Sequence, residues 1–288
     1  MSNGKGQVIR VAVDAMGGDH APVEIVKGAL MAASEGLVHI ILVGEYEVLT
    51  DILRDQGSDG LEVEVVPAEG MIQEGESPNE ALRRKPRASI MIAAQLVKNG
   101  RADALVSMGA TGATLASAYF TLGLLEGVER PVLGGPFIGL APRTVFVDLG
   151  TNVDCRPGQL VSFGVIGSVL CSSYLGISSP RVGLLSVGTE PGKGNRQVKE
   201  AYHLFQESGL NFVGLLEGND LLTGNADVVV CDGFIGNIAL KVAEGTFDFV
   251  RSVLREEVKT SLLSKLGYLA MKGPFSALGD RADYSEVG

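Results

Sequence analysis

Residues 11–22 have the sequence VAVDAMGGDHAP, in which a short apolar run ends abruptly in a polar, glycine-rich loop. Four later stretches repeat this pattern: ALVSMGATGAT (104–114), VFVDLGTNVDC (145–155), LLSVGTEPGKGN (184–195) and VVVCDGFIGN (228–237). Each apolar run is typical of a strand that is buried on both faces. Ligands of open α/β sheets bind beyond the carboxyl ends of the strands, so the five loops together predict one large site for an anionic ligand.

Strand and helix patterns alternate along the chain. We expect strands at 8–14, 39–43, 61–66, 104–107, 144–148, 181–187, 212–216 and 227–231. Helical patterns cover 22–35, 89–99, 112–125, 158–174 and 195–208. This alternation predicts an α/β fold of three layers, in which helices cover both faces of a mostly parallel sheet. We treat residues 1–288 as a single domain; a second lobe fits the length, but the sequence shows no boundary for it.

The segment 237–275 has a different character. Its apolar residues recur every three or four positions: Ala239, Ala243, Phe247, Val250, Leu254, Val258, Leu262, Leu266 and Leu269. This spacing predicts one long helix or two helices in line, with lysines and arginines beside the apolar stripe. Two interpretations remain open. The stripe packs on the sheet, or the helices protrude and meet a partner subunit or the membrane surface.

Composition narrows the class of protein. The chain of 288 residues carries a formal net charge of −10, which argues against a nucleic-acid binder. Its three cysteines are odd in number and match no zinc pattern, so we expect a reducing, cytoplasmic setting and no metal site. The N-terminus lacks the apolar core of a signal peptide, and we expect no stretch that approaches the ~20 uncharged apolar residues of a membrane span.

The first loop offers groups for phosphate binding and for proton transfer. Asp14 precedes Gly17 and Gly18, and His20 stands just before a helix that begins with proline. Backbone N–H groups near the two glycines and the helix N-terminus can hold phosphate. His20 can donate to an oxyanion or act as an acid–base group. The alternative is a tight turn between strand and helix.

The second loop and a basic cluster are further candidates for anion binding. Gly109, Thr111 and Gly112 open a helix and let a ligand approach the backbone closely, although a simple packing turn is the alternative. The loop lacks the G-x-G-x-x-G pattern, so a dinucleotide site is disfavoured. In RRKPRAS (83–89), Arg83 and Arg84 precede a helix N-terminus and are predicted to bind an anion.

The loop 186–195 is similar to a P-loop but does not match the spacing and residue types of that motif. Gly188 and Gly192 are one residue too close, and Gly194 replaces the Ser or Thr that would bind magnesium. Lys193 is a cation beside the start of a helix, and we predict that it binds the phosphate of the substrate, with a catalytic role. Its neighbours Gly192, Gly194 and Asn195 are also assigned to substrate binding.

Two more loops contribute polar side chains. We assign Asn152, in the loop that follows the strand at 144–148, to substrate binding. Asp232 is assigned a catalytic role, and Asn237 is assigned to substrate binding. Each can instead order its loop or cap the next helix. Cys155 has no histidine nearby in the sequence and is not expected to be a nucleophile.

Together these stretches resemble the bacterial phosphate acyltransferases of phospholipid synthesis. The matching segments are VDAMGGDHAP, EALRRKPRASIMIAAQLVKNGRADALVSMGATGA, VDLGTNVDCRP, PRVGLLSVGTEPGKGN and ADVVVCDGFIGN, in the order of that family and over nearly the whole chain. This chain departs from the family at Ala110, at Ala88 and in the Gly150–Asn152 tripeptide. The family also continues past Gly288 with a glycine-rich segment, so we expect the C-terminal end to be truncated.

The resemblance implies a fold related to the isocitrate and isopropylmalate dehydrogenases and to phosphate acetyltransferase. It implies a homodimer in the cytosol, associated loosely with the membrane or with a membrane acyltransferase. The expected reaction joins the acyl group of acyl-(acyl carrier protein) to inorganic phosphate, without a further cofactor. Phosphate is then the nucleophile, so the protein needs only to bind the dianion and stabilise an oxyanion.

Three rival functions remain open at this point. A CoA-dependent phosphate acetyltransferase would share the fold and the nucleophile. A nicotinamide-dependent dehydrogenase would share the fold, but the dinucleotide pattern and an evident set of metal-binding carboxylates are missing. A membrane-recruited scaffold without enzymatic activity is supported only by the amphipathic segment near the C-terminus.

Overall fold

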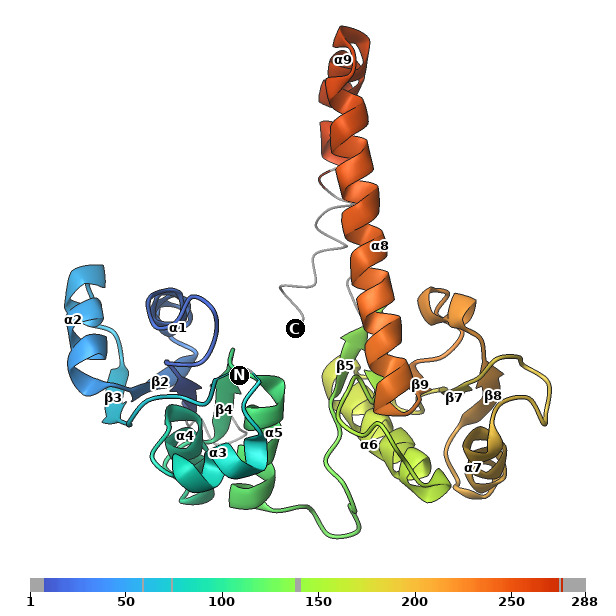
Figure 1. Ribbon diagram of the computed structural model, residues 1–288, viewed down its shortest axis with the longest axis horizontal. Coiled ribbons are helices and arrows are strands. Elements are labelled where there is room, and N and C mark those ends of the chain that lie inside the picture. Colours follow the sequence, from blue (N-terminus) through green and yellow to red (C-terminus); the bar gives the residue numbers. More distant parts are fainter. Residues whose placement is uncertain (1–7, 59, 74, 138–140, 275, 277–288) are drawn as a thin grey trace. The chain divides into compact units, whose positions relative to one another are not determined.

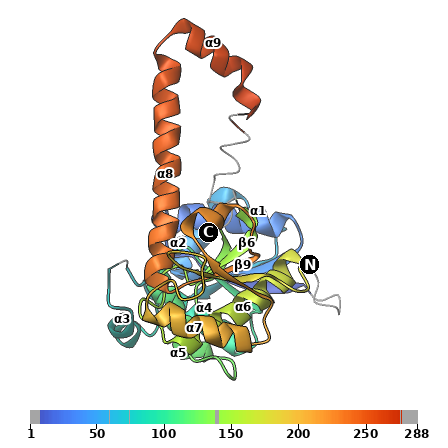
Figure 2. The same cartoon turned by 90° about the vertical axis from the view of Figure 1, so that its right-hand side faces the viewer.

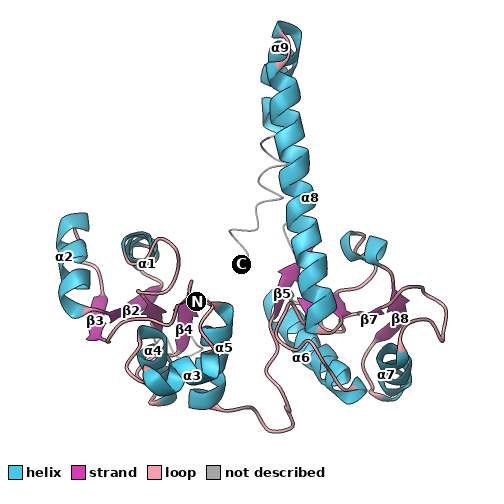
Figure 3. Cartoon of the chain, viewed as in Figure 1, coloured by secondary structure: helices cyan, strands magenta, loops and turns pink. Residues whose placement is uncertain are grey.

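The computed structural model describes residues 8–58, 60–73, 75–137, 141–274 and 276. Contacts group the chain into two compact units, Met1–Gly127 and Val128–Gly288, where the sequence analysis expected one domain. The division arises because each unit has a sheet and buried clusters of its own. In both units helices surround the strands (Figure 3).

The first unit is built on four parallel strands in the order β3-β2-β1-β4. Its elements along the chain are β1 (Ile9–Asp14), α1 (Val23–Ser34), β2 (Val38–Gly44), α2 (Tyr46–Gln56), β3 (Val63–Pro67), α3 (Pro78–Arg84), α4 (Ser89–Lys98), β4 (Ala104–Ser107) and α5 (Thr111–Leu122). Alternate strand residues face opposite sides of the sheet. Val13 and Leu42 pack against α1 and α2, whereas Ala12 and Ile41 pack against α4.

The second unit has five strands in the order β5-β6-β9-β7-β8. Its elements are β5 (Gly134–Phe137), β6 (Ala141–Val147), α6 (Pro157–Leu175), β7 (Val182–Leu185), α7 (Arg196–Glu207), β8 (Phe212–Leu216), the 3-10 helix η1 (Gly218–Leu222), β9 (Val228–Val230), α8 (Gly233–Lys259) and α9 (Leu262–Ala270). Only the β5–β6 pair of this sheet is antiparallel.

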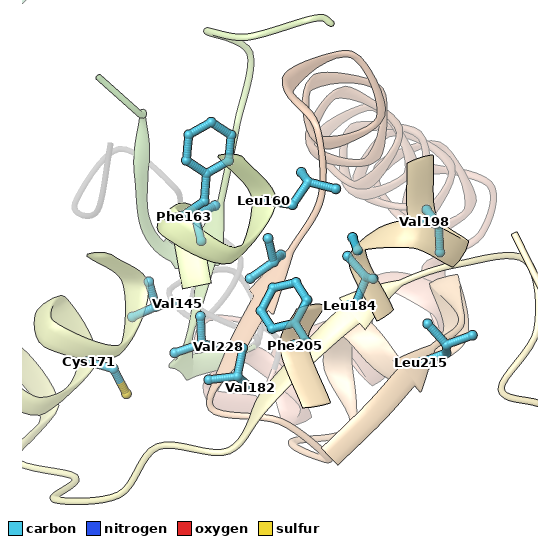
Figure 4. Packing of buried hydrophobic residues seen from close by; sticks show 13 residues of the cluster. Val145, Leu160, Phe163, Cys171, Val182, Leu184, Val198, Phe205, Leu215 and Val228 are labelled. Atoms are coloured by element: carbon cyan, nitrogen blue, oxygen red, sulfur yellow. The ribbon is translucent and has the colours of Figure 1, made fainter. Parts of the chain in front are cut away.

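Helices cover both faces of the second sheet as well. On one face, strand residues such as Val182 and Val228 pack against Phe163 of α6 and Phe205 of α7, as Figure 4 shows. On the other face, Phe146 and its neighbours pack against η1 and the first turns of α8. Each unit is therefore a three-layer α/β/α sandwich, and the predicted fold class is confirmed.

All eight expected strands are present, with ends shifted by a few residues. The sequence analysis missed β5, α2 and α3. β5 has the sequence GGPF, which lacks β-branched residues, and it pairs only with β6. Proline is tolerated in such an edge strand because its missing N–H faces no partner.

Helix α6 contradicts the expectation that no stretch of the chain could pass as a membrane span. An 18-residue stretch of this 19-residue helix has a mean hydropathy of 1.4, and by length and composition alone the helix could cross a membrane. The buried side chains of Leu160, Phe163 and Cys171 instead place α6 against the second sheet. A helix that packs in a core on one side can be apolar for that reason alone.

The segment predicted to be helical over 237–275 forms most of α8 and all of α9. Ile235, Ala239 and Ala243 of α8 pack on the second sheet, and the helix then extends away from that sheet (Figures 1 and 2). Beyond that point its apolar residues are largely exposed, as are Leu263, Leu266 and Leu269 of α9. The start of α8 thus belongs to the core, whereas its far part and α9 do not.

The ion pair between Arg10 and Asp103 predicts a loss of stability in acid. The Arg10 side chain donates to Asp103 at 2.9 and 3.0 Å, its backbone N–H donates at 2.9 Å, and these bonds lower the pKa of Asp103 from 3.8 to about 2. A depressed folded-state pKa stabilises the fold above the unfolded value, and this contribution disappears as the pH falls from about 4 to about 2. The difference in urea unfolding midpoint between the wild type and Asp103→Asn should therefore shrink over this range.

Asp51→Asn is the control for the loss of one negative charge, since Asp51 forms an exposed pair with Arg54 within α2. A difference between wild type and Asp103→Asn that is as large at pH 2 as at pH 6 would contradict the prediction.

Candidate active site

The predicted site residues fall into two groups, one in each unit. In the first unit, β1 and β4 are neighbours, and their register places Asp14 beside Ser107. The buried Asp14 carboxylate accepts hydrogen bonds from Ser107 Oγ at 2.7 Å and from the Met16 N–H at 3.3 Å. Ser107 Oγ in turn accepts from the Gly109 N–H at 3.1 Å. Asp14 therefore holds the two strand-end loops together, and this placement favours an organising role for its carboxylate.

Gly17 and Gly18 are required because the two loops touch through their backbones. A Cβ on Gly17 would lie 2.6 Å from Asp14 Oδ2 and 3.0 Å from the Gly109 backbone. Gly18 has φ +111°, and a Cβ there would lie 3.0 Å from the Met108 carbonyl oxygen. No other residue fits either position, so the glycines that were predicted for ligand contact also fix the loop geometry.

The N-terminus of α5 presents uncapped backbone donors next to this contact. Thr111 and Gly112 are its first residues, and both are exposed. The N-cap residue Ala110 provides no side-chain hydrogen bond. Within the described part of the chain, no acceptor is recorded for the Thr111 or Gly112 N–H. Such free donors favour an anion.

The basic cluster after α3 is largely neutralised by neighbouring carboxylates. Lys85 pairs with Glu76 at 2.6 Å, Arg87 with Glu69 at 2.7 Å and Arg84 with Glu80 at 3.8 Å. Arg83 is exposed and has no ion pair with any residue that the structure describes. Of the two arginines predicted to bind an anion, Arg83 is thus the one that is free to do so.

Ser89 lies at the first position of α4, next to this cluster. Its hydroxyl is fully buried and has no hydrogen-bond partner among the described residues. Ala88, the N-cap of α4, and Ala110, the N-cap of α5, belong to the same packed cluster, so the two helix starts lie together. A buried hydroxyl without a partner is rare and points to a ligand or water at this place.

His20 ends the first loop. Its side chain is exposed, and its backbone oxygen accepts from the Glu24 N–H at the start of α1. The ring is thus carried by the loop that contacts Gly109 and is accessible to a ligand. An acid–base role for His20 stays a prediction.

In the second unit, the loop after β6 folds around one carboxylate. Asp148 is completely buried and accepts from the N–H groups of Gly150, Thr151 and Asn152 at 2.7 to 3.1 Å. The Asn152 side-chain amide also donates to Asp148 and to the Pro131 carbonyl, both at 2.8 Å. Asn152 is itself buried, so its placement favours a role in holding the loop over direct ligand contact.

The start of α8 fits tightly against this loop. Asp232 caps the helix by accepting from the Ile235 N–H at 2.9 Å, and the Gly233 N–H donates to the Asn152 carbonyl at 2.7 Å. A Cβ on Gly236 would collide with the Asp148 carbonyl oxygen. Asn237 is exposed beside Gly150. The structure thus brings Asn152, Asp232 and Asn237 close together, with one Asp232 oxygen engaged in the cap.

The loop after β7 carries the remaining predicted residues. Lys193 is exposed, its stem lies beside Gly188, and no described carboxylate pairs with its ammonium group. Gly192 and Gly194 have φ of +94° and +96°, which lets the backbone turn sharply on both sides of the lysine. The Asn195 side chain caps α7 by accepting from the Val198 N–H at 2.9 Å. Lys193 is therefore the free cation of this loop, whereas the Asn195 oxygen is engaged in the cap.

Cys155 is a poor nucleophile. Its thiol donates to the Asn152 carbonyl at 3.2 Å. Burial, followed by the negative charges of Asp232 and Asp148, raises the pKa of this thiol to about 11. Little thiolate exists at neutral pH with such a pKa, and the thiolate is the reactive form.

Four residues that are not among the predicted site residues stand out in the structure. Asp148 and Ser107 organise the loops, while the hydroxyls of Ser89 and Ser186 are buried without a partner. Ser107 is the last residue of β4 and Ser186 directly follows β7, and a serine at the end of a strand is a weak signal that could have identified them. Ser89 gives no such signal, because serine is common at helix starts.

Among its described residues, each unit thus offers free backbone or side-chain donors for an anion and shows no activated nucleophile. In the ranges that the structure describes, no group of three or more His, Cys, Asp or Glu side chains is placed to hold a metal ion. This chemistry suits a reaction in which a bound anion attacks an electrophile.

Comparison with solved structures shows a similar fold. A phosphotransacetylase from Streptococcus pyogenes aligns with a TM-score of 0.64 at 20% identity, covering 84% of this chain and 82% of that one. The EutD phosphotransacetylase from Staphylococcus aureus aligns with a TM-score of 0.62 at 19% identity, covering 84% and 83%. At this level of identity the likeness concerns the fold.

Comparison of sequences identifies the family. The phosphate acyltransferase of Pelotomaculum thermopropionicum is 47% identical over 280 residues, which is 97% of this chain and 82% of the relative. The phosphate acyltransferase of Aquifex aeolicus is 44% identical over 282 residues, which is 98% and 83%. The model of the family described as "Fatty acid synthesis protein" matches residues 9–288, and the chain belongs to this family.

Proposed function

We propose that this protein transfers the acyl group of acyl-(acyl carrier protein) to inorganic phosphate and so supplies acyl phosphate for phospholipid synthesis. A phosphate oxygen attacks the thioester carbon, a C–O bond forms, the C–S bond breaks and the departing thiolate takes up a proton. Family membership supports the reaction class. The structural observation that carries the proposal is Lys193, which is exposed between two glycines with positive φ and has no ion-pair partner among the described residues.

The roles of the other residues follow from their contacts. Lys193 of the second unit is assigned to supply positive charge for phosphate. In the first unit, Arg83 and the Thr111 and Gly112 N–H groups are assigned to bind an anionic group of the substrates. His20 is our choice for polarising the thioester carbonyl or protonating the leaving thiolate, because its ring is exposed on a loop of the first group. The Asp232 carboxylate keeps one oxygen outside the helix cap, and we assign it to orienting a donor of the substrate or of a neighbouring loop.

We propose a cytoplasmic homodimer that binds the membrane peripherally and passes its product to a membrane acyltransferase. The three cysteines of the chain are free thiols, in keeping with a reducing compartment. The exposed apolar side chains of α8 and α9 are the candidate surface for a second subunit and for lipid. Lys259 and Lys265 beside them favour an anionic membrane.

The function is tested by mixing the protein with hexadecanoyl-(acyl carrier protein) and phosphate and by trapping the product with hydroxylamine. We expect phosphate-dependent hydroxamate, and unmodified protein by mass spectrometry after incubation with the donor alone. Activity with hexadecanoyl-CoA and none with the carrier protein would favour the CoA-dependent alternative. NADH formation from a hydroxy acid would favour a dehydrogenase, and the absence of any product would favour a scaffold.

Replacement of Lys193 by alanine should mainly weaken phosphate binding. Loss of one charge-assisted contact corresponds to roughly 1.5–3 kcal/mol, or an increase of about 10- to 150-fold in the KM for phosphate. Steady-state kinetics at saturating acyl donor measure this change. Lys199→Ala removes the same charge from an exposed position on α7 and should leave the KM nearly unchanged. Equal effects of the two substitutions, or none for Lys193→Ala, would refute the assignment.

The membrane contact is tested by replacing Leu263 and Leu266 of α9 with glutamate. These side chains are 80% and 63% exposed, so the variant should fold and stay soluble. Burial of a leucine contributes about 1.5–3 kcal/mol, so binding to phosphatidylglycerol vesicles should fall by at least about 100-fold in a sedimentation assay. Thr246→Glu with Ser252→Glu adds the same charge to exposed positions of α8 and is the control. A misfolded Leu263/Leu266 variant, or one that binds vesicles normally, would overturn this part of the proposal.

A further inference from the structure

A pocket of about 530 Å³ lies wholly within the second unit. It is bounded by the end of β7, by η1 and by the first three turns of α8. Its volume falls in the range of about 300–1,000 Å³ that is usual for small-molecule sites. None of the residues assigned to loop organisation in the other strand-end loops lines it.

The walls of this pocket are apolar along most of their length. Ile235, Ile238, Ala239 and Val242 follow the i, i+3, i+4, i+7 spacing that places side chains on one face of α8. Leu222 lines the opposite wall on η1. Ile238, Val242 and Leu222 are 46%, 61% and 47% exposed, so water now covers much of this surface. Such an exposed apolar surface gains free energy when it is covered by hydrocarbon.

One end of the pocket is polar. It is formed by Ser186, Gly194 and Asn195, which belong to the loop that carries Lys193. Ser186 Oγ is buried and has no hydrogen-bond partner among the described residues. A Cβ on Gly194 would lie 3.0 Å from that oxygen, so the glycine keeps the space beside the hydroxyl open. A buried hydroxyl in this position is satisfied when a ligand supplies an oxygen.

We propose that this pocket holds the hydrocarbon chain of the acyl substrate and that Ser186 donates a hydrogen bond to an oxygen at its reacting end. This inference rests on the proposed function and adds the site that selects the chain. A ligand with a long apolar body and one polar end matches this pocket, because the apolar walls lie on α8 and η1 and the polar end holds Ser186. The placement of Ser186 puts that polar end beside Lys193, where the phosphate is expected.

The test compares donors of increasing chain length. Each methylene buried in the pocket should strengthen binding about fourfold, so kcat/KM should rise from hexanoyl- to hexadecanoyl-(acyl carrier protein). Ala239→Phe fills the pocket from α8. Its kcat/KM with the hexadecanoyl donor should fall by about tenfold or more, while the value with the hexanoyl donor stays within about twofold. Thr246→Phe adds the same ring to an exposed position of α8 outside the pocket and should change neither value.

Two further variants keep the test decisive. Val242→Asp alters an exposed pocket residue and therefore should fold even if Ala239→Phe does not; it should flatten the dependence on chain length in the same way. Ser186→Ala should lower the rate with all donors by a similar factor of about 2 to 12, because it removes one hydrogen bond and no apolar contact.

A direct binding measurement separates this inference from the proposed function. The fluorescent fatty acid cis-parinaric acid should bind the wild type and bind the Ala239→Phe or Val242→Asp variant at least about tenfold more weakly. If the wild type makes no acyl phosphate, the proposed function fails, and this measurement still decides on the pocket. Equal losses with short and long donors, or unchanged binding and chain-length dependence in folded variants, would overturn the inference. A change of oligomeric state without a change in chain-length dependence would assign the pocket to a second copy of the chain.

Discussion

The arrangement of candidate groups depends on the parallel pairing of short, buried strands. Parallel register places the carboxyl ends of neighbours at one edge, so that Asp14 meets Ser107 in the first unit and Val147 meets Val230 in the second. The loops that leave these ends must then share a small space. Buried carboxylates solve this packing problem by accepting backbone N–H groups that would otherwise lack partners, as Asp148 does for three consecutive residues. Glycines permit the remaining close contacts, because a side chain at Gly17 or Gly236 would collide with the neighbouring loop.

The close packing of the loops divides the polar residues into two kinds that the sequence alone does not distinguish. Asp14, Asp148 and Asn152 are buried and engaged with the loops, whereas His20, Arg83 and Lys193 are exposed and have no ion-pair partner within the described chain. A reaction that uses bound phosphate as the nucleophile needs exposed groups that can contact the phosphate. The buried groups support them by holding the loops in place. The raised pKa of the Cys155 thiol agrees with this division, because the same buried carboxylates that order the loop make that thiol unreactive.

Much of the fold was predictable because the strands are continuous runs of valine, isoleucine and leucine that end in glycine-rich loops. The edge strand β5 was not, since GGPF has no run of such residues and its only strand partner among the described residues is β6. The division into two units was also hidden, because the segment around Gly127 differs little in composition from other loops. The sequence placed most of the candidate residues on loops between strands and helices, as the structure has them, but could not distinguish Arg83 from Arg84, because only the ion pair with Glu80 separates them. Burial without a partner is a property of the folded chain, so Ser89 gave no signal in the sequence, and Ser186 gave only the weak one of a serine directly after a strand.

The tight fit of α8 against the loop after β6 has a mechanical consequence. The helix has 27 residues and is therefore about 40 Å long, and its root touches the Asp148 backbone through a glycine, with no flexible side chain between them. The N-terminal end of this long helix is in direct contact with the loop. A small tilt at its first turns would therefore move the far end of the helix, near Lys259, by several ångströms.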